Sequence, residues 1–208
     1  MEERSSRDSW EAEYRARGRL WGGVVRSLPD LSPGSRVLDL GCGDGKLLEA
    51  TRGCGWALTA LDFSENAAQL CKKKSLSSVS ALVTGNARAL PFRHNAFDAV
   101  LAFHVIGHLD CKDRRTAARE IFRVLIPGGQ LFFSGFSRFD LRYARGMMVE
   151  EASYMRGNGI VTHYFSRDEV VGLFSELDPV SVSFHEWTMQ VRGKNLRRSE
   201  VYGVFTKK

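Results

Sequence analysis

The stretch VLDLGCGDGK, residues 37 to 46, joins an apolar run to a loop that contains three glycines. The apolar run predicts a buried strand, and the residues after the loop predict a short helix. Glycine allows the backbone to turn tightly and to approach a ligand without a Cβ in the way. In open α/β sheets, ligands bind beyond the carboxyl ends of the strands. We therefore interpret residues 41–45 as a ligand-binding loop.

The chain around this loop alternates between short apolar segments and helical segments. Strands are predicted at 36–40, 57–62, 80–85, 97–103 and 130–136, and helices at 46–52, 64–74 and 113–125. Short apolar strands that alternate with helices indicate a parallel sheet with both faces covered. The expected fold is therefore α/β, with a doubly wound and mostly parallel sheet.

The C-terminal part of the chain follows a different pattern. Residues 137–163 show no regular periodicity, and a capping box predicts a helix over 166–177. Residues 180–191 and 200–207 alternate with period two, which predicts a closing antiparallel pair joined by the basic loop at 193–198. With these two strands the expected sheet has seven strands.

The composition is that of a soluble globular protein, with 208 residues, 43% hydrophobic and 26% charged side chains. We expect one cytoplasmic domain and no membrane association, because no apolar stretch reaches the roughly 18 residues that span a bilayer and the charged N-terminus lacks a signal-like core. The four cysteines form no C-x-x-C pair, so free buried thiols and no metal site are expected. The net charge of +6 favours an anionic partner or reflects solubility alone.

The residues near the loop argue against a dinucleotide as the ligand. A dinucleotide-binding loop has the pattern G-x-G-x-x-G, and Lys46 stands where the third glycine would be. Asp39 and Asp44 add carboxylates that suit a cation better than a pyrophosphate. Asp62 ends the next predicted strand, where a carboxylate can accept hydrogen bonds from both hydroxyls of a ribose.

With these motifs the sequence resembles the class I S-adenosylmethionine-dependent methyltransferases, in particular the methyltransferase type 11 domain. The matching segments are VLDLGCGDG (glycine-rich motif), LTALDFS (ribose motif), TGNARALPF (adenine motif), FDAVLAFHVIGHL (fourth strand) and EIFRVLIPGGQLFFS (fifth strand). The resemblance implies a Rossmann-like fold, methyl transfer as the activity and S-adenosyl-L-methionine as the cofactor. It also divides the single domain of residues 1–208 into four parts: an N-terminal helical lid (1–30), a cofactor-binding core (35–136), a substrate-side cap (137–165), and a C-terminal helix with closing strands (166–208).

The resemblance also implies which residues bind the cofactor. In the core they are Asp39, Gly41, Cys42, Gly43, Asp44, Asp62, Phe63, Asn86, Ala87, Phe103 and His104. Asp62 would hold the ribose, Phe63 would pack on the adenine, and Asn86 with Ala87 would face its exocyclic edge. The family usually has an acid at position 86, and Asn86 keeps the acceptor oxygen without the charge.

The predicted N-terminal helix contributes further candidates. In many members of the family such a segment folds over the cofactor as a lid. Tyr14 and Arg19 would then reach the carboxylate of the cofactor, and Trp21 would line one side of the site. The alternative is that these aromatic side chains pack the helix on the sheet.

His104 and His108 are the candidates for a general base, which methyl transfer needs only when the acceptor carries a proton. They stand four residues apart, and on one helical turn they would point the same way. Histidine commonly titrates near neutral pH, which suits a base. The alternative is that His104 contacts the cofactor or packs, and that His108 caps the following helix.

The expected acceptor is a small molecule, anionic or aromatic, bound by residues 136–166. This segment contains Arg138, Arg142, Arg145, Arg156, Tyr143, Tyr154, Met147, Met148 and His163. The alternative is a solvated helix whose arginines balance Asp140, Glu150 and Glu151.

RNA is the competing acceptor, because basic residues recur on one predicted helix at Arg115, Arg119 and Arg123. Further basic residues lie at 72–74, 194, 197–198 and 207–208, scattered over the chain. A protein acceptor and a non-catalytic, cofactor-binding partner subunit are further alternatives. The expected assembly is a monomer or a homodimer.

Overall fold

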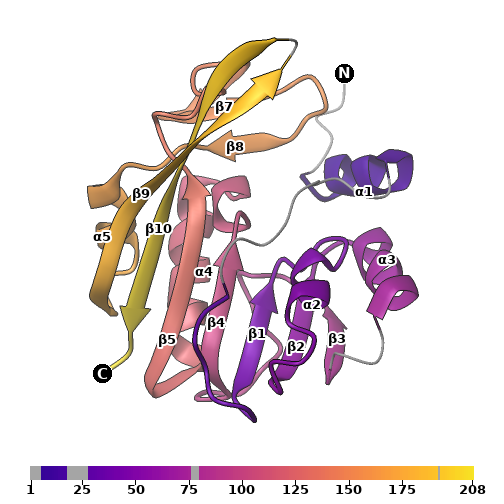
Figure 1. Ribbon diagram of the computed structural model, residues 1–208, viewed down its shortest axis with the longest axis vertical. Coiled ribbons are helices and arrows are strands. Elements are labelled where there is room, and N and C mark those ends of the chain that lie inside the picture. The colour runs from indigo at the N-terminus through magenta and orange to yellow at the C-terminus, as the bar shows by residue number, and fades with distance from the viewer. Residues whose placement is uncertain (1–5, 18–27, 76–79, 192) are drawn as a thin grey trace.

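The computed structural model describes residues 6–17, 28–75, 80–191 and 193–208. Its centre is a seven-stranded sheet in the order β3-β2-β1-β4-β5-β10-β9 (Figure 1). The strands are β1 (Arg36–Leu40), β2 (Ala57–Asp62), β3 (Ala81–Thr84), β4 (Phe97–Phe103), β5 (Leu125–Phe136), β9 (Asp178–Val191) and β10 (Lys194–Thr206). Strands β1 to β5 are parallel, and β10 runs antiparallel to both β5 and β9. The predicted α/β sheet is therefore confirmed.

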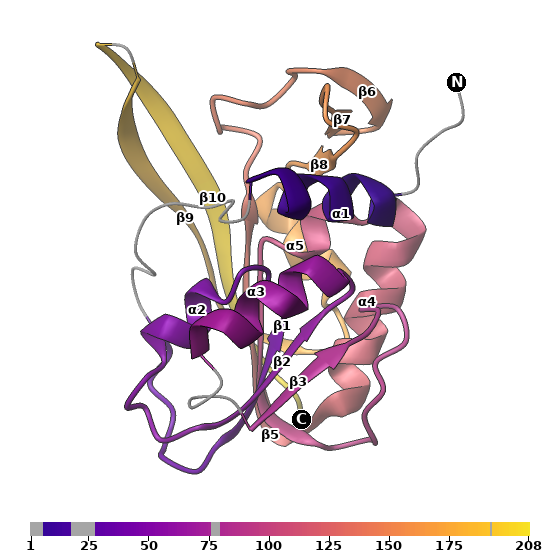
Figure 2. The ribbon, with the colours of Figure 1, turned by 90° about the vertical axis from the view of Figure 1, so that its right-hand side faces the viewer.

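Helices cover both faces of this sheet, as Figure 2 shows. The helices are α1 (Ser6–Arg17), α2 (Lys46–Ala50), α3 (Glu65–Ser75), α4 (Cys111–Val124), α5 (Arg167–Leu173) and the short 3₁₀ helix η2 (Ile106–His108). Within β1, Leu38 and Leu40 belong to the core that includes residues of α4 and α5, whereas Val37 belongs to the core that includes residues of α2 and α3. Alternate side chains of a strand point to opposite faces, so an apolar β1 serves two cores at once.

The C-terminal hairpin is longer than predicted. The basic stretch at 193–198 was expected as a loop, but Lys194 begins β10 and Arg198 pairs with Trp187 across the hairpin. This prediction is wrong because the period-two pattern continues through the basic residues, whose charge does not interrupt an edge hairpin. The extended hairpin rises past the carboxyl ends of the parallel strands (Figure 2).

Residues 137–163, which showed no periodicity, contain a second small sheet. Its antiparallel strands are β6 (Met147–Glu150), β7 (Ser153–Met155) and β8 (Val161–His163), in that order. Strands of three or four residues are too short to show a clear alternation in sequence. Ile160, at the entry to β8, packs with Trp10, Tyr14 and Ala67, so this small sheet supports α1.

Helix α1 lies across the carboxyl ends of the parallel strands and docks on α3 (Figure 2). The Glu11 carboxylate accepts hydrogen bonds from the backbone N–H groups of Glu65 (2.6 Å) and Asn66 (3.3 Å), the first residues of α3. A carboxylate at a helix N-terminus satisfies backbone donors that have no partner within the helix. Glu11 therefore caps α3 from another helix and fixes α1 over the end of the sheet.

Replacing Glu11 with alanine is expected to loosen α1 without unfolding the domain. Loss of such a cap costs about 1 kcal/mol, which raises the local opening equilibrium of α1 about fivefold. Hydrogen exchange of the α1 amides measures this change. Arg7→Ala is the matched control, because the Arg7–Glu65 ion pair is exposed and contributes little. Equal exchange in both variants would contradict the role of Glu11.

All four cysteines are free thiols, but the prediction that they are buried holds only for Cys42 and Cys71, since Cys54 is half-buried and Cys111 is exposed. Among the residues that the structure describes, no group of histidine, cysteine and acidic side chains is arranged to hold a metal ion. No helix in the same residues is both long and apolar enough to cross a bilayer.

Candidate functional site

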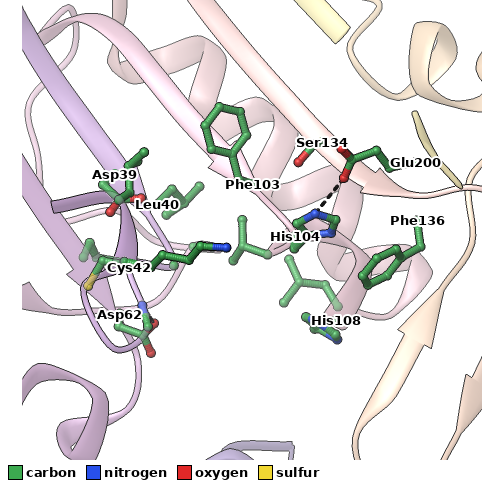
Figure 3. A pocket seen from close by; sticks show the side chains of 18 of the residues that line it. Asp39, Leu40, Cys42, Asp62, Phe103, His104, His108, Ser134, Phe136 and Glu200 are labelled. Atoms are coloured by element: carbon green, nitrogen blue, oxygen red, sulfur yellow. Dashed lines mark hydrogen bonds and ion pairs between the residues drawn. The ribbon is translucent and has the colours of Figure 1, made fainter. Parts of the chain in front are cut away.

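A cavity of about 590 Å³ opens at the carboxyl ends of the parallel strands (Figure 3). One half is lined by the glycine-rich loop and by the ends of β2 and β3, and the other half by β4, β5 and the β9–β10 hairpin. The predicted residues that line it are Tyr14, Asp39, Gly41, Cys42, Gly43, Asp44, Asp62, Phe63, Asn86, Ala87, Phe103, His104 and His108. Arg19 and Trp21 lie outside the described residues.

The glycine-rich loop needs its glycines for both conformation and space. Gly41 has φ +77°, and a Cβ there would lie 2.7 Å from the Cβ of Val105. Gly43 has φ +54°, and its Cβ would lie 2.8 Å from the hydroxyl of Tyr14. Side chains rarely adopt positive φ, and no real Cβ tolerates contacts this close. The loop therefore runs directly beneath α1 and the start of η2.

Asp62 joins the glycine-rich loop to the end of β2. Its Oδ2 accepts a hydrogen bond from Gly43 N and its Oδ1 from Ser64 N, each at 2.9 Å. The side chain is buried, and burial raises the pKa of the carboxyl even though these N–H groups act to lower it. Each oxygen keeps a second lone pair for a ligand. Asp62 thus has a structural role that its place in the sequence motif did not indicate.

Asp39 presents an unsatisfied carboxylate oxygen at the cavity. It is buried at 4% exposure, and its Oδ2 has no hydrogen-bond partner. Burial, with a smaller contribution from the negative charge of Asp62, raises the pKa of Asp39 to about 8. A buried acid without a counter-charge is costly to ionise, so this position favours a positively charged ligand group.

The residues expected at an adenine ring lie together at the ends of β2 and β3. Phe63 is half-buried beside Ala67 and Leu70 of α3, and Ala87 is buried. The Oδ1 of Asn86 accepts hydrogen bonds from the backbone N (3.0 Å) and Nε (3.2 Å) of Arg88. The acceptor oxygen of Asn86 is therefore engaged within its own turn, which leaves its NH₂ group as the donor for a ligand.

Tyr14 and Cys42 are both buried at the loop. The pKa of the Tyr14 phenol is raised well above its usual range by burial and by nearby acids, so the hydroxyl stays protonated as a hydrogen-bond donor. The Sγ of Cys42 lies 3.8 Å from the Sγ of Cys71, and the Cys71 thiol donates to Gly43 O at 3.0 Å. The Cys71 thiol therefore supports the loop from α3.

His104 and His108 do not share a helical turn, so the prediction that they point the same way is wrong. His104 has φ +56°, and the 3₁₀ helix begins only at Ile106. His108 Nδ1 lies 2.7 Å from Val161 O, and its ring meets Trp10 edge-on at 4.8 Å. Burial lowers the pKa of His108 to about 4, so it is neutral near pH 7. The cap of α4 is Asp110 and not His108.

His104 instead faces the C-terminal hairpin. Its Nε2 lies 2.9 Å from Oε2 of Glu200 in β10, and its ring packs on Phe136 with centroids 4.4 Å apart (Figure 3). Sequence reasoning missed Glu200, together with the other hairpin residues that line this half of the cavity. They are Ser183, Phe184, His185, Trp187, Arg198 and Tyr202. The available signal was the alternation of Arg198, Glu200 and Tyr202, which places all three on one face of β10.

The arginines of 136–166 were expected to line an acceptor pocket, and this expectation is wrong for the described cavity. Phe136 is the only described residue of that segment among those lining it. Asp140 accepts hydrogen bonds from Arg142 Nε (3.0 Å) and Arg198 Nε (2.7 Å), and Arg138 lies 3.4 Å from Glu151. The ion pairs of Arg138 and Arg142 with acids agree with the alternative interpretation. The solvated helix that it assumed is wrong, because the segment contains β6 to β8 and Asp140 is buried.

The basic stripe that was considered for RNA binding, on the predicted helix at 113–125, is interrupted. Arg123 forms an ion pair with Glu120 at 2.7 Å and donates to Phe92 O and Leu90 O. Its guanidinium therefore fixes the 90–92 turn against α4 and is not available to track a phosphate backbone.

Known proteins share these motifs and this fold. Residues 38–133 match the protein family described as a methyltransferase domain. The probable tRNA methyltransferase 9B of Mus musculus is 37% identical over 119 residues, which are 54% of this chain and 24% of that protein. The tRNA N(3)-cytidine methyltransferase METTL2 of Danio rerio is 28% identical over 160 residues, covering 71% of this chain and 45% of that protein. The matches thus span from about a quarter to just under half of these curated relatives.

A solved structure agrees over nearly the whole fold. The S-adenosylmethionine-dependent methyltransferase of Methanosarcina mazei aligns with a TM-score of 0.68 and 25% identity, over 85% of this chain and 94% of that one. Such enzymes take S-adenosyl-L-methionine as their cofactor, and the free acceptor oxygen of Asp39 and the glycine-rich loop fit it. Residues 38–133 thus form a methyltransferase domain, and the fold is that of the class I S-adenosylmethionine-dependent methyltransferases.

Proposed function

We propose that the protein transfers the methyl group of S-adenosyl-L-methionine to a base in RNA. The observation that carries the proposal is a cavity whose two halves differ in chemistry. The glycine-rich loop lines one half, and aromatic side chains together with Arg198 and Glu200 line the other. The first half suits the nucleoside and amino-acid parts of the cofactor, and the second suits a flat ring.

In this proposal the loop residues hold the cofactor. Asp62 accepts hydrogen bonds from the ribose hydroxyls, and Phe63, Asn86 and Ala87 surround the adenine. Asp39 lies nearest the positive charges, and Tyr14 donates from α1. When bound, the cofactor supplies a methyl group on a positively charged sulfur. The protein's contribution is then to hold acceptor and methyl group in line, and positioning of this kind can supply roughly 7–11 kcal/mol.

The choice of RNA rests on the relatives, which are named for action on tRNA. The aromatic half of the cavity supports it, since bases of unpaired nucleotides are commonly recognised by stacking. A small-molecule acceptor, as first expected from the sequence, is the alternative that the experiment distinguishes.

The test is transfer of labelled methyl groups from S-adenosyl-L-methionine to fractions of a cell extract. Under the proposal the label appears in the RNA fraction and disappears after treatment with ribonuclease. Label in a ribonuclease-resistant fraction of low molecular mass would replace RNA with a small molecule. Tight binding of the cofactor with no label in any fraction would favour a non-catalytic partner subunit.

Gly41→Ala is expected to weaken cofactor binding at least tenfold and to lower the free energy of unfolding by about 2–4 kcal/mol. The new Cβ would meet Val105 at 2.7 Å while the residue keeps a positive φ. Calorimetric titration and thermal unfolding measure the two effects. Gly34→Ala is the control, since Gly34 has φ +85° but no atom within 4 Å of the added Cβ. Equal losses in both variants would mean that the backbone conformation, and not the close approach, accounts for the effect.

A further inference from the structure

His104 is held in an unusual backbone conformation at the centre of the cavity. It has φ +56°, which is uncommon for a residue other than glycine, and its N–H donates to Ser134 O at 2.8 Å. Backbone strain of this kind persists only where surrounding contacts fix it, and it is enriched at functional sites. Here the ring is fixed between Phe136 and the carboxylate of Glu200. The conformation therefore directs the imidazole at β10.

The ring nitrogens of His104 differ in their surroundings. Nδ1 is buried without a hydrogen-bond partner, whereas Nε2 lies 2.9 Å from Oε2 of Glu200. A proton on a buried, unpaired nitrogen is costly, so the geometry favours an N–H on Nε2, which donates to Glu200. His104 then has no accessible basic nitrogen for an acceptor. It orients the Glu200 carboxylate, which lines the cavity.

The hairpin surrounds Glu200 with flat side chains. Glu200 pairs with His185 across the hairpin, and the rings of His185 and Trp187 stack with centroids 5.5 Å apart. The guanidinium of Arg198 lies over Trp187 at 5.2 Å and over Phe136 at 5.1 Å. Asp140 fixes Arg198 from behind through a 2.7 Å hydrogen bond. These groups form a rigid wall of stacked planes next to one carboxylate.

We infer that Glu200, with Trp187, forms the acceptor subsite, and that it takes a flat heteroaromatic ring with an N–H group directed at Glu200. The inference rests on the proposed function and names the chemistry of its acceptor. His104 is a positioning residue for Glu200. The acceptor nitrogen forms a bond to the methyl carbon, and the carbon–sulfur bond breaks with its electron pair left on sulfur. The proton on that nitrogen passes to the carboxylate of Glu200.

The subsite is tested first by binding, without turnover. The protein is loaded with S-adenosylhomocysteine and titrated with uridine, 3-methyluridine, cytidine and N4,N4-dimethylcytidine, followed by saturation-transfer NMR. We expect uridine to bind at least tenfold more tightly than 3-methyluridine, or cytidine at least tenfold more tightly than N4,N4-dimethylcytidine. In each pair the methylated nucleoside lacks the N–H group. Equal binding within both pairs, or no binding of any nucleoside, would overturn the inference.

Variants then distinguish the role of Glu200 from that of His104. Glu200→Gln should remove the preference for the N–H group and raise the KM for the acceptor at least tenfold, with unchanged affinity for S-adenosyl-L-methionine. His104→Gln keeps an N–H donor near the position of Nε2 but cannot take a proton, so it should retain most activity, whereas His104→Ala should lose it. Trp187→Leu should weaken nucleoside binding at least tenfold.

Matched controls lie on the same hairpin and beside it. Glu186 forms an ion pair with Arg197 and does not line the cavity, so Glu186→Gln should leave acceptor binding unchanged. Phe139 is 53% exposed and does not line the cavity, so Phe139→Leu is the control for Trp187→Leu. If His104→Gln were as inactive as His104→Ala while Glu200→Gln kept wild-type kinetics, His104 would be the base and the inference would be wrong.

The outcomes distinguish this inference from the proposed function. Binding of a nucleoside that depends on Glu200, with no methyl transfer to RNA, would retain the subsite and reject RNA methylation. Methyl transfer to RNA that is indifferent to Glu200 and Trp187 would retain the function and reject the subsite.

Discussion

Asp62→Ala is expected to raise the dissociation constant for S-adenosyl-L-methionine about 100-fold while the chain remains folded. Hydrogen bonds to a charged group contribute about 1.5–3 kcal/mol each, so losing those to two ribose hydroxyls costs about 3 kcal/mol or more. The substitution also leaves Gly43 N and Ser64 N without their carboxylate partner. The glycine-rich loop would then lose its fixed position as well as its ligand contact, and both effects weaken binding in the same direction.

The effect on stability should be smaller than the effect on binding. Two backbone donors lose their partner, but the protein no longer buries a carboxyl whose pKa is raised by desolvation. We expect a net loss of about 1–2 kcal/mol in the free energy of unfolding. Calorimetric titration and chemical denaturation measure the two quantities separately.

Asp98→Ala is the matched control for Asp62→Ala. Asp98 lies near the start of β4, at the amino ends of the parallel strands and so away from the cavity. It accepts hydrogen bonds from Arg36 N (2.7 Å) and Arg36 Nη2 (2.9 Å). Its removal should cost a similar amount of stability and leave cofactor affinity unchanged. Wild-type affinity in Asp62→Ala would mean that this carboxylate does not hold the ribose.

The cofactor half of the cavity was accessible to sequence analysis because its residues come from local motifs. Asp39, the glycines and Asp62 each stand at the end of a strand, and parallel strands bring their carboxyl ends to one edge of the sheet. Strand existence and order therefore suffice to place them together. Even so, the hydrogen bonds of Asp62 to the loop depend on a register that no local pattern specifies.

The acceptor half was not accessible in the same way. His104 and Glu200 are 96 positions apart and meet only because β10 pairs with β5, the neighbour of β4. The sequence predicted that 200–207 pairs with 180–191, but not that it pairs with β5. The basic residues before Glu200 were interpreted as a loop, which removed Arg198 from the strand face. The positive φ of His104 also has no signature in the sequence, because it is imposed by tertiary contacts.

Binding of S-adenosyl-L-methionine is expected to release nearly one proton at pH 7, with Asp39 as its source. The pKa of this carboxyl in the free protein is about 8, mainly because it is buried. At pH 7 about nine-tenths of the protein therefore carries a proton on Asp39. A positively charged ligand beside Oδ2 favours the ionised form, so binding and deprotonation are linked. Affinity should rise about tenfold per pH unit from about pH 6 to 8 and level off above that.

Calorimetry in buffers of different ionisation enthalpy measures the released proton directly. Asp39→Asn should release none, bind more weakly at pH 8 and show a flat pH profile between 6 and 8. Proton release of wild-type size in this variant would move the linkage to another group, such as the buried Asp62.

The same carboxyl has the opposite effect on the stability of the ligand-free protein. An unfolded aspartate ionises near its ordinary pKa of 3.8, whereas folded Asp39 holds its proton up to about pH 8. The contribution of Asp39 to stability is therefore fully present below pH 4 and is lost as the pH rises toward 8. Asp39→Asn should consequently unfold at a higher temperature than the wild type at pH 8, and at a similar temperature at pH 4. A variant that is more stable yet binds the cofactor less tightly would identify Asp39 as a residue kept for binding at the expense of the fold.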